Sequence, residues 1–417
     1  MIKTEHISKP ELLAPAGSWE ALMGAIQGGC NAVYFGIEQL NMRARSANNF
    51  VVDDLQKIND TCHEHGVKTY LTLNTIIYNH DIQLMKAILD AAKQTKTDAV
   101  IASDHAVMNY AKKIGMPVHI STQTNITNID TIEFYAAYGD VMVMARELTL
   151  KQVGELVREI KRRNITGPSG ELIKIEIFAH GALCMAVSGK CYLSLHTHFS
   201  SANRGACIQN CRRSYIVTDK EDGYELEIDN EYIMSAKDLC TIDFLDEIIR
   251  DTGVSVLKIE GRGRSEDYVN VTTKCYREAI DSVLDGTYSK EKIKDWYGRL
   301  ETTFNRGFWE GYYLGRKMGE WNDIQGSKAK KKKVFIGTGM NYFDKLGVAE
   351  FKVESQKLAL NDEIMISGPT TGVVFEKVTE MRVDDQQRTE VKRGETVSIP
   401  IATKIRRSDK LYKMANA

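Results

Sequence analysis

The sequence of 417 residues has few of the features that mark special classes of protein. It contains only 6 prolines, which excludes a proline-rich or fibrous protein. It has no uninterrupted apolar run of about 18 residues, the length needed to span a membrane. The amino-terminal segment carries charges and no apolar core, so we expect no secretory signal, no membrane association and a location in the cytoplasm.

The sequence also has almost no excess charge, because 55 basic residues face 56 acidic ones and the formal net charge is −1. A polyanion partner would therefore need a local basic patch, and we expect no DNA partner. The glycine-rich fingerprint of dinucleotide-binding proteins is missing, since the turn after the first expected strand is Pro15-Ala16-Gly17-Ser18. The nucleophile elbow of serine hydrolases and the HExxH helix of zinc proteases are missing too.

Short apolar runs do alternate with helical patterns, and they do so eight times. Apolar strands without alternation are buried on both faces, which is typical of a parallel sheet. Eight such units favour a closed (β/α)8 TIM-like barrel over an open sheet. The expected strands are residues 12–16, 32–37, 68–75, 99–102, 118–121, 141–145, 173–178 and 254–259.

The pattern divides the chain into three regions. Residues 1–286 are expected to form the barrel, with a long insertion at residues 180–240 after strand seven and a helix over residues 241–250. Residues 287–333 read as a helical extension that ends in a basic linker, Lys328 and Lys330–Lys333. Residues 334–417 change to short strands with turn signals and are expected to form a small β-barrel that resembles the second domain of translation elongation factors.

Five of the 8 cysteines lie in the insertion, on the face of the barrel where catalytic loops gather. In a reducing compartment such a cluster of thiols indicates metal binding. Four thiolates hold either Zn²⁺ or an iron–sulfur cluster, and the wide spacing favours the cluster. The five are Cys184, Cys191, Cys207, Cys211 and Cys240, whereas the helical Cys30, Cys62 and Cys275 are expected in the core.

The sequence around these cysteines resembles the collagenase-like peptidase family, the thirty-second of the unclassified peptidases. The resemblance covers the barrel, and the C-terminal region resembles a domain that part of the family carries. The motifs are IEIFAHGALCMA (residues 175–186), SGKCYLS (188–194), RGACIQNCR (204–212), SAKDLC (235–240) and KIEGR (258–262).

The resemblance implies a 4Fe–4S cluster and oxygen-independent hydroxylation. One branch of the family hydroxylates the wobble uridine of tRNA to 5-hydroxyuridine with prephenate as the oxygen source, another acts on 23S ribosomal RNA, and a third acts in ubiquinone synthesis. By position, Cys184, Cys191 and Cys207 correspond to cluster ligands. The fourth ligand is Cys211 in the pattern of the tRNA branch, or Cys240 in the pattern of the quinone branch.

Other polar residues end the expected strands and therefore face the barrel mouth. Arg43 and Arg45 are candidates for a clamp on prephenate, a small dicarboxylate. Further substrate contacts are expected from Asn74, Gln123 and Arg146. Glu260, Arg262 and His180 are the candidate catalytic groups, with Glu260 as a general acid–base group and His180 as a proton donor or a partner of a cluster sulfur.

Three functions stay open on the sequence alone. The first is a tRNA hydroxylase with a 4Fe–4S cluster and prephenate. The second is a peptidase, as the family name implies, although a thiolate bound to iron is not free to act as a nucleophile. The third is a zinc-stabilised scaffold that binds RNA.

Overall fold

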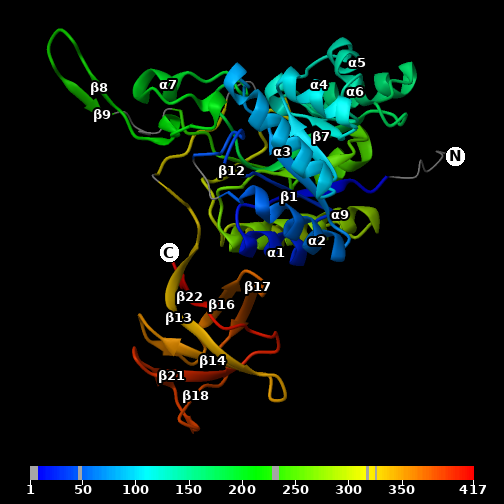
Figure 1. Cartoon of the computed structure of the whole chain (residues 1–417). Coiled ribbons are helices and arrows are strands. Elements are labelled where there is room, and N and C mark those ends of the chain that lie inside the picture. The colour runs from blue at the N-terminus through cyan, green and yellow to red at the C-terminus, as the bar shows by residue number, and fades with distance from the viewer. Residues whose placement is uncertain (1–7, 46–48, 228–233, 316–318, 325) are drawn as a thin grey trace.

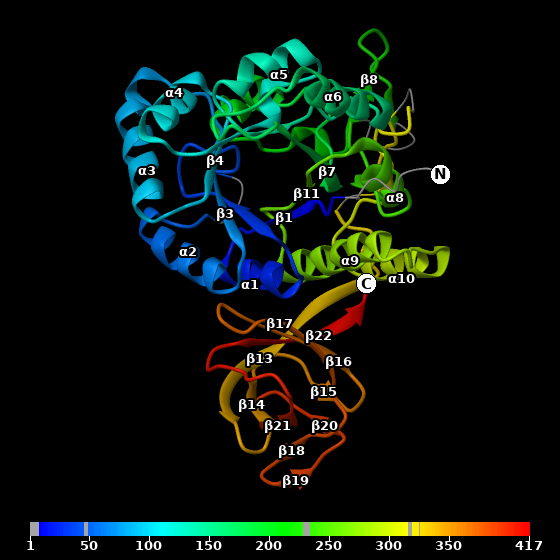
Figure 2. The same ribbon diagram turned by 90° about the vertical axis from the view of Figure 1, so that its right-hand side faces the viewer.

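Eight parallel strands close into a barrel, as the sequence predicts. The structure is a computed structural model, and it describes residues 8–45, 49–227, 234–315, 319–324 and 326–417. The last barrel strand pairs with both the first and the seventh, which closes the ring seen end-on in Figure 2. The strands are β1 (Glu11–Pro15), β2 (Ala32–Phe35), β3 (Lys68–Leu73), β4 (Ala99–Ala102), β5 (Val118–Ile120), β6 (Val141–Val143), β7 (Lys174–Ala182) and β11 (Val256–Ile259).

Helices connect these strands and cover the barrel from outside (Figures 1 and 2). The helix expected over residues 241–250 is shorter than predicted: α8 covers only Leu245–Glu247 and continues as a π-helical turn over Ile248–Thr252. The other helices are α1 (Trp19–Gln27), α2 (Leu55–Glu64), α3 (Ile82–Gln94), α4 (His105–Ile114), α5 (Ile129–Ala136), α6 (Leu150–Arg163), α9 (Glu266–Leu284) and α10 (Lys290–Leu300).

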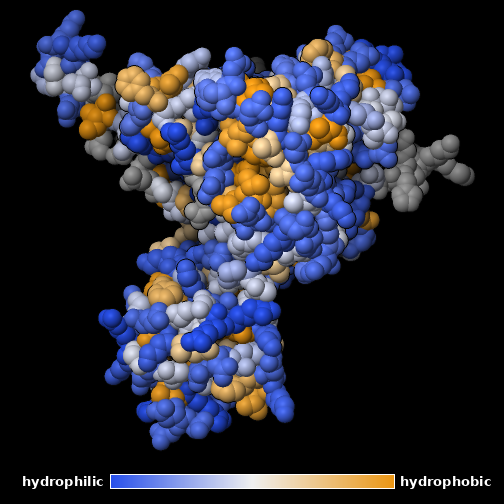
Figure 3. Space-filling view, in the orientation of Figure 1, coloured by the Kyte–Doolittle hydropathy of each residue, from blue (hydrophilic) through white to orange (hydrophobic). Residues whose placement is uncertain are grey.

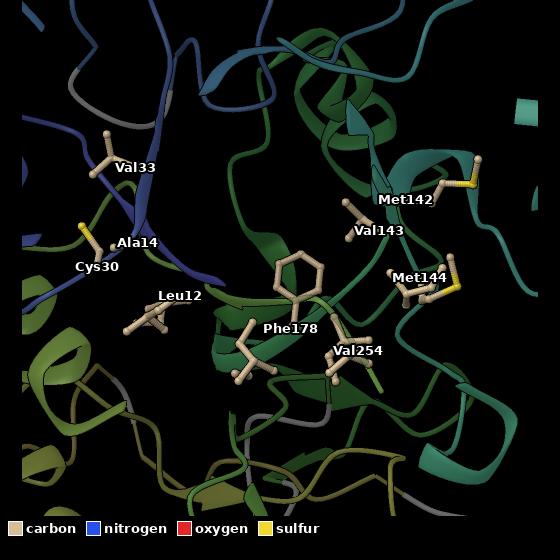
Figure 4. Packing of buried hydrophobic residues seen from close by; sticks show 14 of the residues in the cluster. Leu12, Ala14, Cys30, Val33, Met142, Val143, Met144, Phe178 and Val254 are labelled. Carbon is tan, nitrogen blue, oxygen red and sulfur yellow. The ribbon is translucent and has the colours of Figure 1, made fainter. Parts of the chain in front are cut away.

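One apolar core fills the space between the strands and the surrounding helices. Figure 4 shows part of it, with Leu12 and Val33 on one side and Met142 and Val254 on the other. The core also contains Cys30, Cys62 and Cys275, which confirms that these three are packing residues. Burial raises the pKa of the Cys62 thiol to about 12, so this thiol stays protonated and unreactive at neutral pH.

The seventh strand is longer than the apolar run predicts, and this extension supports the insertion. Beyond Phe178, β7 continues to Ala182 and pairs antiparallel with β10 (Asp238–Cys240). A short strand, β12 (Phe308–Trp309), pairs with β10 on its other side. The insertion between β7 and β10 contains α7 (Leu193–His198) and the hairpin of β8 (Ile216–Thr218) and β9 (Glu225–Glu227), and it projects from one side of the barrel (Figure 1).

The C-terminal region forms an antiparallel sheet with its own hydrophobic core. Its eight strands lie in the order β17-β16-β22-β13-β14-β21-β18-β19. The sheet packs below the barrel against α1 and α9, where the Gln27 amide donates to the carbonyl of Thr371 (Figures 1 and 2). The strands are β13 (Lys331–Phe343), β14 (Val348–Val353), β16 (Glu363–Gly368), β17 (Gly372–Lys377), β18 (Arg382–Val383), β19 (Gln386–Gln387), β21 (Thr396–Pro400) and β22 (Lys410–Asn416).

The boundary between the two domains differs from the predicted basic linker. Helix α10 is the one helix in the described part of the extension, and strand β13 already begins at Lys331. The lysines of the run form ion pairs with carboxylates: Lys330 with Glu301, and Lys333 with Glu266 at 2.9 Å. The run is therefore a strand with paired charges.

Of the helices in the described residues, none has the length and apolar character needed to cross a membrane.

Candidate functional site

A cavity of about 310 Å³ opens where the barrel strands end. Its floor and walls come from the barrel, including Tyr34 on β2 and the segment that follows β11. The insertion covers it from outside with two stretches, around Cys184–Cys191 and around Cys207–Arg212. The sequence prediction that the cysteine-rich loop lies at the catalytic end of the barrel is thus borne out by the position of the loop.

Four thiols of the insertion line this cavity together: Cys184, Cys191, Cys207 and Cys211. All eight cysteines of the chain are free thiols in the structure. Burial raises the pKa of the Cys211 thiol, Arg212 opposes the increase, and the three neighbouring thiols add to it. Four thiolates this close repel one another, so a bound cation is what would stabilise their ionised forms together.

These thiols share a cavity without converging on one point. Among the described residues, no three His, Cys, Asp or Glu side chains meet closely enough to hold a single metal ion. A single zinc ion binds each of its thiolates at about 2.3 Å. An iron–sulfur cluster spreads its thiolate ligands over separate irons. The donor set, four cysteines beside glycines such as Gly189 and Gly205, has the composition that a cluster requires.

Cys240 lies elsewhere, although the sequence left it open as a fourth ligand. It is buried in the barrel core on β10, where the Tyr276 hydroxyl donates to its Sγ at 3.8 Å. Burial raises the pKa of the Cys240 thiol to about 11. The structure therefore brings Cys211, and not Cys240, to the cavity that the other three thiols line.

Contacts with three barrel loops hold the insertion in place. Arg204 forms an ion pair with Asp81 at 2.5 Å, and this hydrogen-bonded contact lowers the pKa of the Asp81 carboxyl. The Asn125 amide donates to the carbonyl of Ser188 at 3.1 Å. Gly205 has a φ of +79°, and a Cβ there would collide with the backbone of Asn41. The thiol-bearing loops thus rest on the segments after β2, β3 and β5.

The barrel side of the cavity is dominated by positive charge. Glu260 is the one acidic side chain among the described lining residues, and Arg43 lies 3.5 Å from it. Burial acts to raise the pKa of Glu260, but Arg43, Arg146 and other nearby cations outweigh it and hold the pKa below its usual value. The lining cations are Arg43, Arg146, Arg212, Lys258, Arg262, Arg264 and Arg306.

Glu260 is therefore an ionised carboxylate at neutral pH. In that state it accepts hydrogen bonds, including one from the Tyr34 hydroxyl at 3.1 Å. It can receive a proton from a bound molecule but has none to give. Glu260 was expected to act as a general acid or a general base, and its ionised state agrees with the role of a base.

Arg146 lines the cavity, and one of its nitrogens lacks a hydrogen-bond partner among the described residues. Its Nη1 donates to the carbonyl of Ala182 at 3.2 Å, and its guanidinium lies over the Phe178 ring. Its Nε is buried and has no hydrogen-bond partner among the described residues. A buried donor without a partner costs free energy, and this one is enclosed by the protein.

Arg262, in contrast, is held by the protein itself. It donates to Thr72 Oγ1 and to Asn41 Oδ1, both at 2.9 Å, and burial lowers its pKa to about 10, which leaves it protonated. A Cβ at Gly36 would collide with its Nη1. Arg262 thus fixes the loop after β2, which carries Arg43, and positions that loop at the cavity.

Besides Cys240, two other predicted site residues lie outside the cavity. Arg45 is exposed, and only its backbone joins the site through a 3.1 Å hydrogen bond to the Gly205 carbonyl. His180 is buried against Tyr276, whose hydroxyl lies 3.3 Å from its Nδ1, and burial lowers its pKa to about 3. His180 is enclosed and lies outside the cavity, so the structure does not place it to donate a proton to a molecule bound there, contrary to the expectation.

Amide side chains line the cavity opposite the cations. Asn74 ends β3 and donates to Gln123 Oε1 at 3.3 Å, and Gln123 follows β5. Asn203 and Gln209 of the insertion line the same space. Amides carry both donors and acceptors, which suits the imide edge of a uracil base.

The lining residues missed in the sequence include Tyr34, Lys258 and Arg306. A lysine within the apolar run of the last barrel strand was a local signal, because lysine is seldom buried without a partner. Lys258 pairs with the buried Glu176 at 2.7 Å. Arg306 had no local signal, because its place beside Asp238 depends on how the chain returns after α10.

The fold and the cavity define a (β/α)8-barrel protein whose mouth combines four thiols with a positively charged wall. Residues 17–323 match the family described as peptidase family U32, and the chain belongs to that family.

Among curated proteins, the chain is 55% identical over 408 residues to a protein from Porphyromonas gingivalis strain W83 named collagenase, with 98% of each chain covered. It is 30% identical to tRNA hydroxylation protein P1 of Bacillus subtilis, covering 87% of this chain and 84% of that protein. Among solved structures, the U32 peptidase Mk0906 matches with a TM-score of 0.39 at 10% identity, covering 63% of this chain and 96% of that one.

Proposed function

We propose that this protein is an iron–sulfur-dependent RNA hydroxylase that forms 5-hydroxyuridine at the wobble position of tRNA, with prephenate as the oxygen source. The observation that carries the proposal is the cavity itself, in which four thiols face a wall of cations and amides. The relatives named tRNA hydroxylation proteins support the RNA substrate, since they match most of both chains. As a tRNA-modifying enzyme the protein would act in the cytoplasm.

In this proposal Cys184, Cys191, Cys207 and Cys211 hold a 4Fe–4S cluster. Such a cluster supplies one-electron redox chemistry when bound. Four cysteine ligands occupy every iron, so the organic substrates bind through the barrel residues. Zn²⁺ is the alternative occupant of the same thiols, and metal analysis separates the two.

The cations of the cavity would bind the dicarboxylate. Arg146 and Arg43 both line the cavity, and the guanidinium of Arg43 lies beside Glu260. Arginine pairs with carboxylates through two parallel hydrogen bonds, which fixes orientation as well as affinity. Glu260, being ionised, would orient the dicarboxylate by repulsion on one side and accept a proton on the other.

The amide side chains would then bind the uracil. Asn74 and Gln123 present a donor and an acceptor from neighbouring barrel loops, and both lie within the same cavity as the thiols. A base that enters this cavity must leave its stack, which unpaired anticodon bases do at low cost.

Peptidase activity is the second candidate, because the Porphyromonas gingivalis relative that is 55% identical is named collagenase. The sequence contains no serine-hydrolase elbow and no HExxH motif. A cysteine peptidase would need one of the four cavity thiols as its nucleophile, and these are the thiols that hold the cluster in the proposed function. A peptidase would therefore cleave gelatin faster as apoprotein than as holoprotein, whereas a hydroxylase would cleave it in neither form.

Nucleoside analysis tests the hydroxylase directly. A host strain that lacks its own wobble hydroxylation is given this gene, and its total tRNA is digested and measured by mass spectrometry. We expect 5-hydroxyuridine or its derivatives with the wild-type gene and none with Cys211→Ser. No modified nucleoside with the wild-type gene, in cells whose purified protein carries its metal centre, would reject the tRNA substrate.

A further inference from the structure

Two aromatic side chains stand exposed at opposite ends of α7, a helix whose first residue, Leu193, lines the cavity. Tyr192 precedes the helix and is 71% exposed, and Phe199 ends it and is 94% exposed. The neighbours of Tyr192, Cys191 and Leu193, both line the cavity, so Tyr192 lies directly at its edge. Apolar side chains are visible around α7 at the upper left of Figure 3.

Phe199 is exposed at a position that does not suit it. It has a φ of +50°, in the left-handed region that bulky residues rarely adopt. Glycine or asparagine is the usual residue at such a helix end. A large ring in this conformation that is almost wholly in solvent does not stabilise the fold by burial. Its presence therefore indicates a role in binding another molecule.

The helix between the two rings is held rigidly to the thiol-bearing loop. The Ser194 hydroxyl accepts from the Ile208 amide at 3.1 Å, and the Asn210 amide donates to the carbonyl of Leu193 at 3.3 Å. Both contacts join α7 to the segment that carries Cys207 and Cys211. The backbone that carries the two rings is therefore fixed relative to the cavity.

The charge of this segment has one sign. Between Glu176 and Asp219 the sequence contains no Asp or Glu, in a chain where acids and bases are otherwise balanced. The same stretch contains Lys190, Arg204, Arg212 and Arg213, and of these Lys190 and Arg213 are exposed. Positive charge beside exposed rings matches a polyanion that also has flat apolar faces.

We propose that Tyr192 and Phe199, here called the stacking rim, bind unpaired bases of a single-stranded RNA loop by stacking, and so present the neighbouring base to the cavity. The inference rests on the proposed function, because it names the part of the RNA that the protein contacts. Every base has an aromatic face, so the rim gives affinity and position, while the amides inside the cavity select the base.

Binding of holoprotein to fluorescent RNA tests the stacking rim. The probes are an anticodon stem–loop and a blunt RNA duplex of the same length. We expect Tyr192→Ala and Phe199→Asn each to weaken binding of the stem–loop roughly tenfold or more and to leave duplex binding unchanged. Tyr192→Phe keeps the ring and should bind as wild type does. Lys190→Ala should weaken binding of both RNAs and lower the salt dependence by about one charge.

The control variant is Tyr224→Ala. Tyr224 lies in the same insertion and is 70% exposed, but it is surrounded in sequence by Glu221, Asp222 and Glu225. It should bind both RNAs as wild type does. Phe199→Asn suits the left-handed position and should fold at least as well as wild type, and unchanged iron content would show that the thiols are intact.

Two outcomes separate the inference from the proposed function. If wild type binds the stem–loop and both ring variants bind it equally well, the stacking rim is rejected while the hydroxylase stands, and a protein partner becomes the candidate for this surface. If wild-type holoprotein does not bind the stem–loop at all, the rim is rejected together with the tRNA substrate.

Discussion

Single side chains decide the charge that the cavity offers to a ligand. Glu260 keeps its negative charge because Arg43, Arg146 and Arg262 surround it. Seven cations and one acid line the cavity, but Lys258 and Arg306 are paired with Glu176 and Asp238 behind the lining. The remaining excess of positive charge favours an anionic ligand over a cationic one.

The two arginines after β2 provide a matched test of this anion site. Arg43 faces the cavity and Arg45 lies outside it. We expect Arg43→Ala to weaken prephenate binding roughly tenfold to a hundredfold, since one charge-assisted hydrogen bond contributes about 1.5–3 kcal/mol. Arg45→Ala should bind as wild type does. Calorimetric titration of both variants measures the difference, and equal losses would argue against the placement of the clamp.

His180 affects the pH dependence of the stability of the fold, and it does not contact the cavity. Its pKa is about 3 in the folded chain, because burial, with a smaller contribution from Arg264, disfavours the charged ring. An unfolded chain binds a proton at this histidine below a pH of about 6.5. The contribution of a neutral His180 to stability is therefore full above about pH 6.5 and is lost as the pH falls toward 3.

Replacing His180 by glutamine should remove that part of the pH dependence. Between pH 7 and about pH 5, wild type should lose roughly 2 kcal/mol more free energy of unfolding than His180→Gln. His119, whose pKa burial also lowers to about 3, is present in both proteins and cancels in the comparison. Urea denaturation at the two pH values measures this, and identical losses would show that His180 is protonated in the fold.

At the scale of elements, the insertion determines which cysteines can act together. Two of its stretches bring four thiols to the cavity, while β10 carries Cys240 into the barrel core. The sequence alone left Cys211 and Cys240 as alternatives. Their separation depends on the antiparallel pairing of β10 with the end of β7, a contact between segments far apart in the chain.

Iron analysis of two serine variants follows from this arrangement. Cys211→Ser should lose the cluster or retain a fraction of the iron, because it removes one of four ligands. Cys240→Ser should keep the wild-type iron and sulfide content, with a modest loss of stability from its core position. Loss of iron in Cys240→Ser with retention in Cys211→Ser would reverse the assignment.

The elements themselves were largely predictable from the sequence. The eight barrel strands are short apolar runs between helical patterns, and the predicted ranges lie within a few residues of the observed strands. Arg43, Arg146 and Glu260 were found because residues that end barrel strands face the mouth. The pairing of β10 and β12, and the place of Arg306, depend on long-range contacts that leave no local pattern.

The lysine run shows where a local pattern misled. A group of lysines is usually a solvated linker, but here Lys331 begins strand β13, and Lys333 forms ion pairs with Glu266 and Asp267 on the first turn of α9. Burial opposes the charge of Lys333, and the two carboxylates outweigh it and raise its pKa. Lys333 thus joins the two domains through its ion pairs, whereas Lys332 of the same run is exposed.

At the scale of the whole molecule, the cavity belongs to the barrel side, and no described residue of the C-terminal sheet lines it. The C-terminal sheet packs against α1 and α9, below the barrel, while the insertion projects from another side of the barrel (Figures 1 and 2). The cavity is lined by residues of the barrel and the insertion and by Arg306 of the segment after α10.

Four thiols of the insertion hold an iron–sulfur cluster in the proposed function, and metal analysis of protein purified without oxygen examines this assignment. Visible absorption and iron, sulfide and zinc contents are measured for wild type and for Cys184→Ala. We expect a brown wild-type protein with a broad band near ~400 nm and about four irons per chain, and loss of both in the variant. A colourless wild-type protein with one zinc, or with no metal, would show that the four thiols do not hold an iron–sulfur cluster.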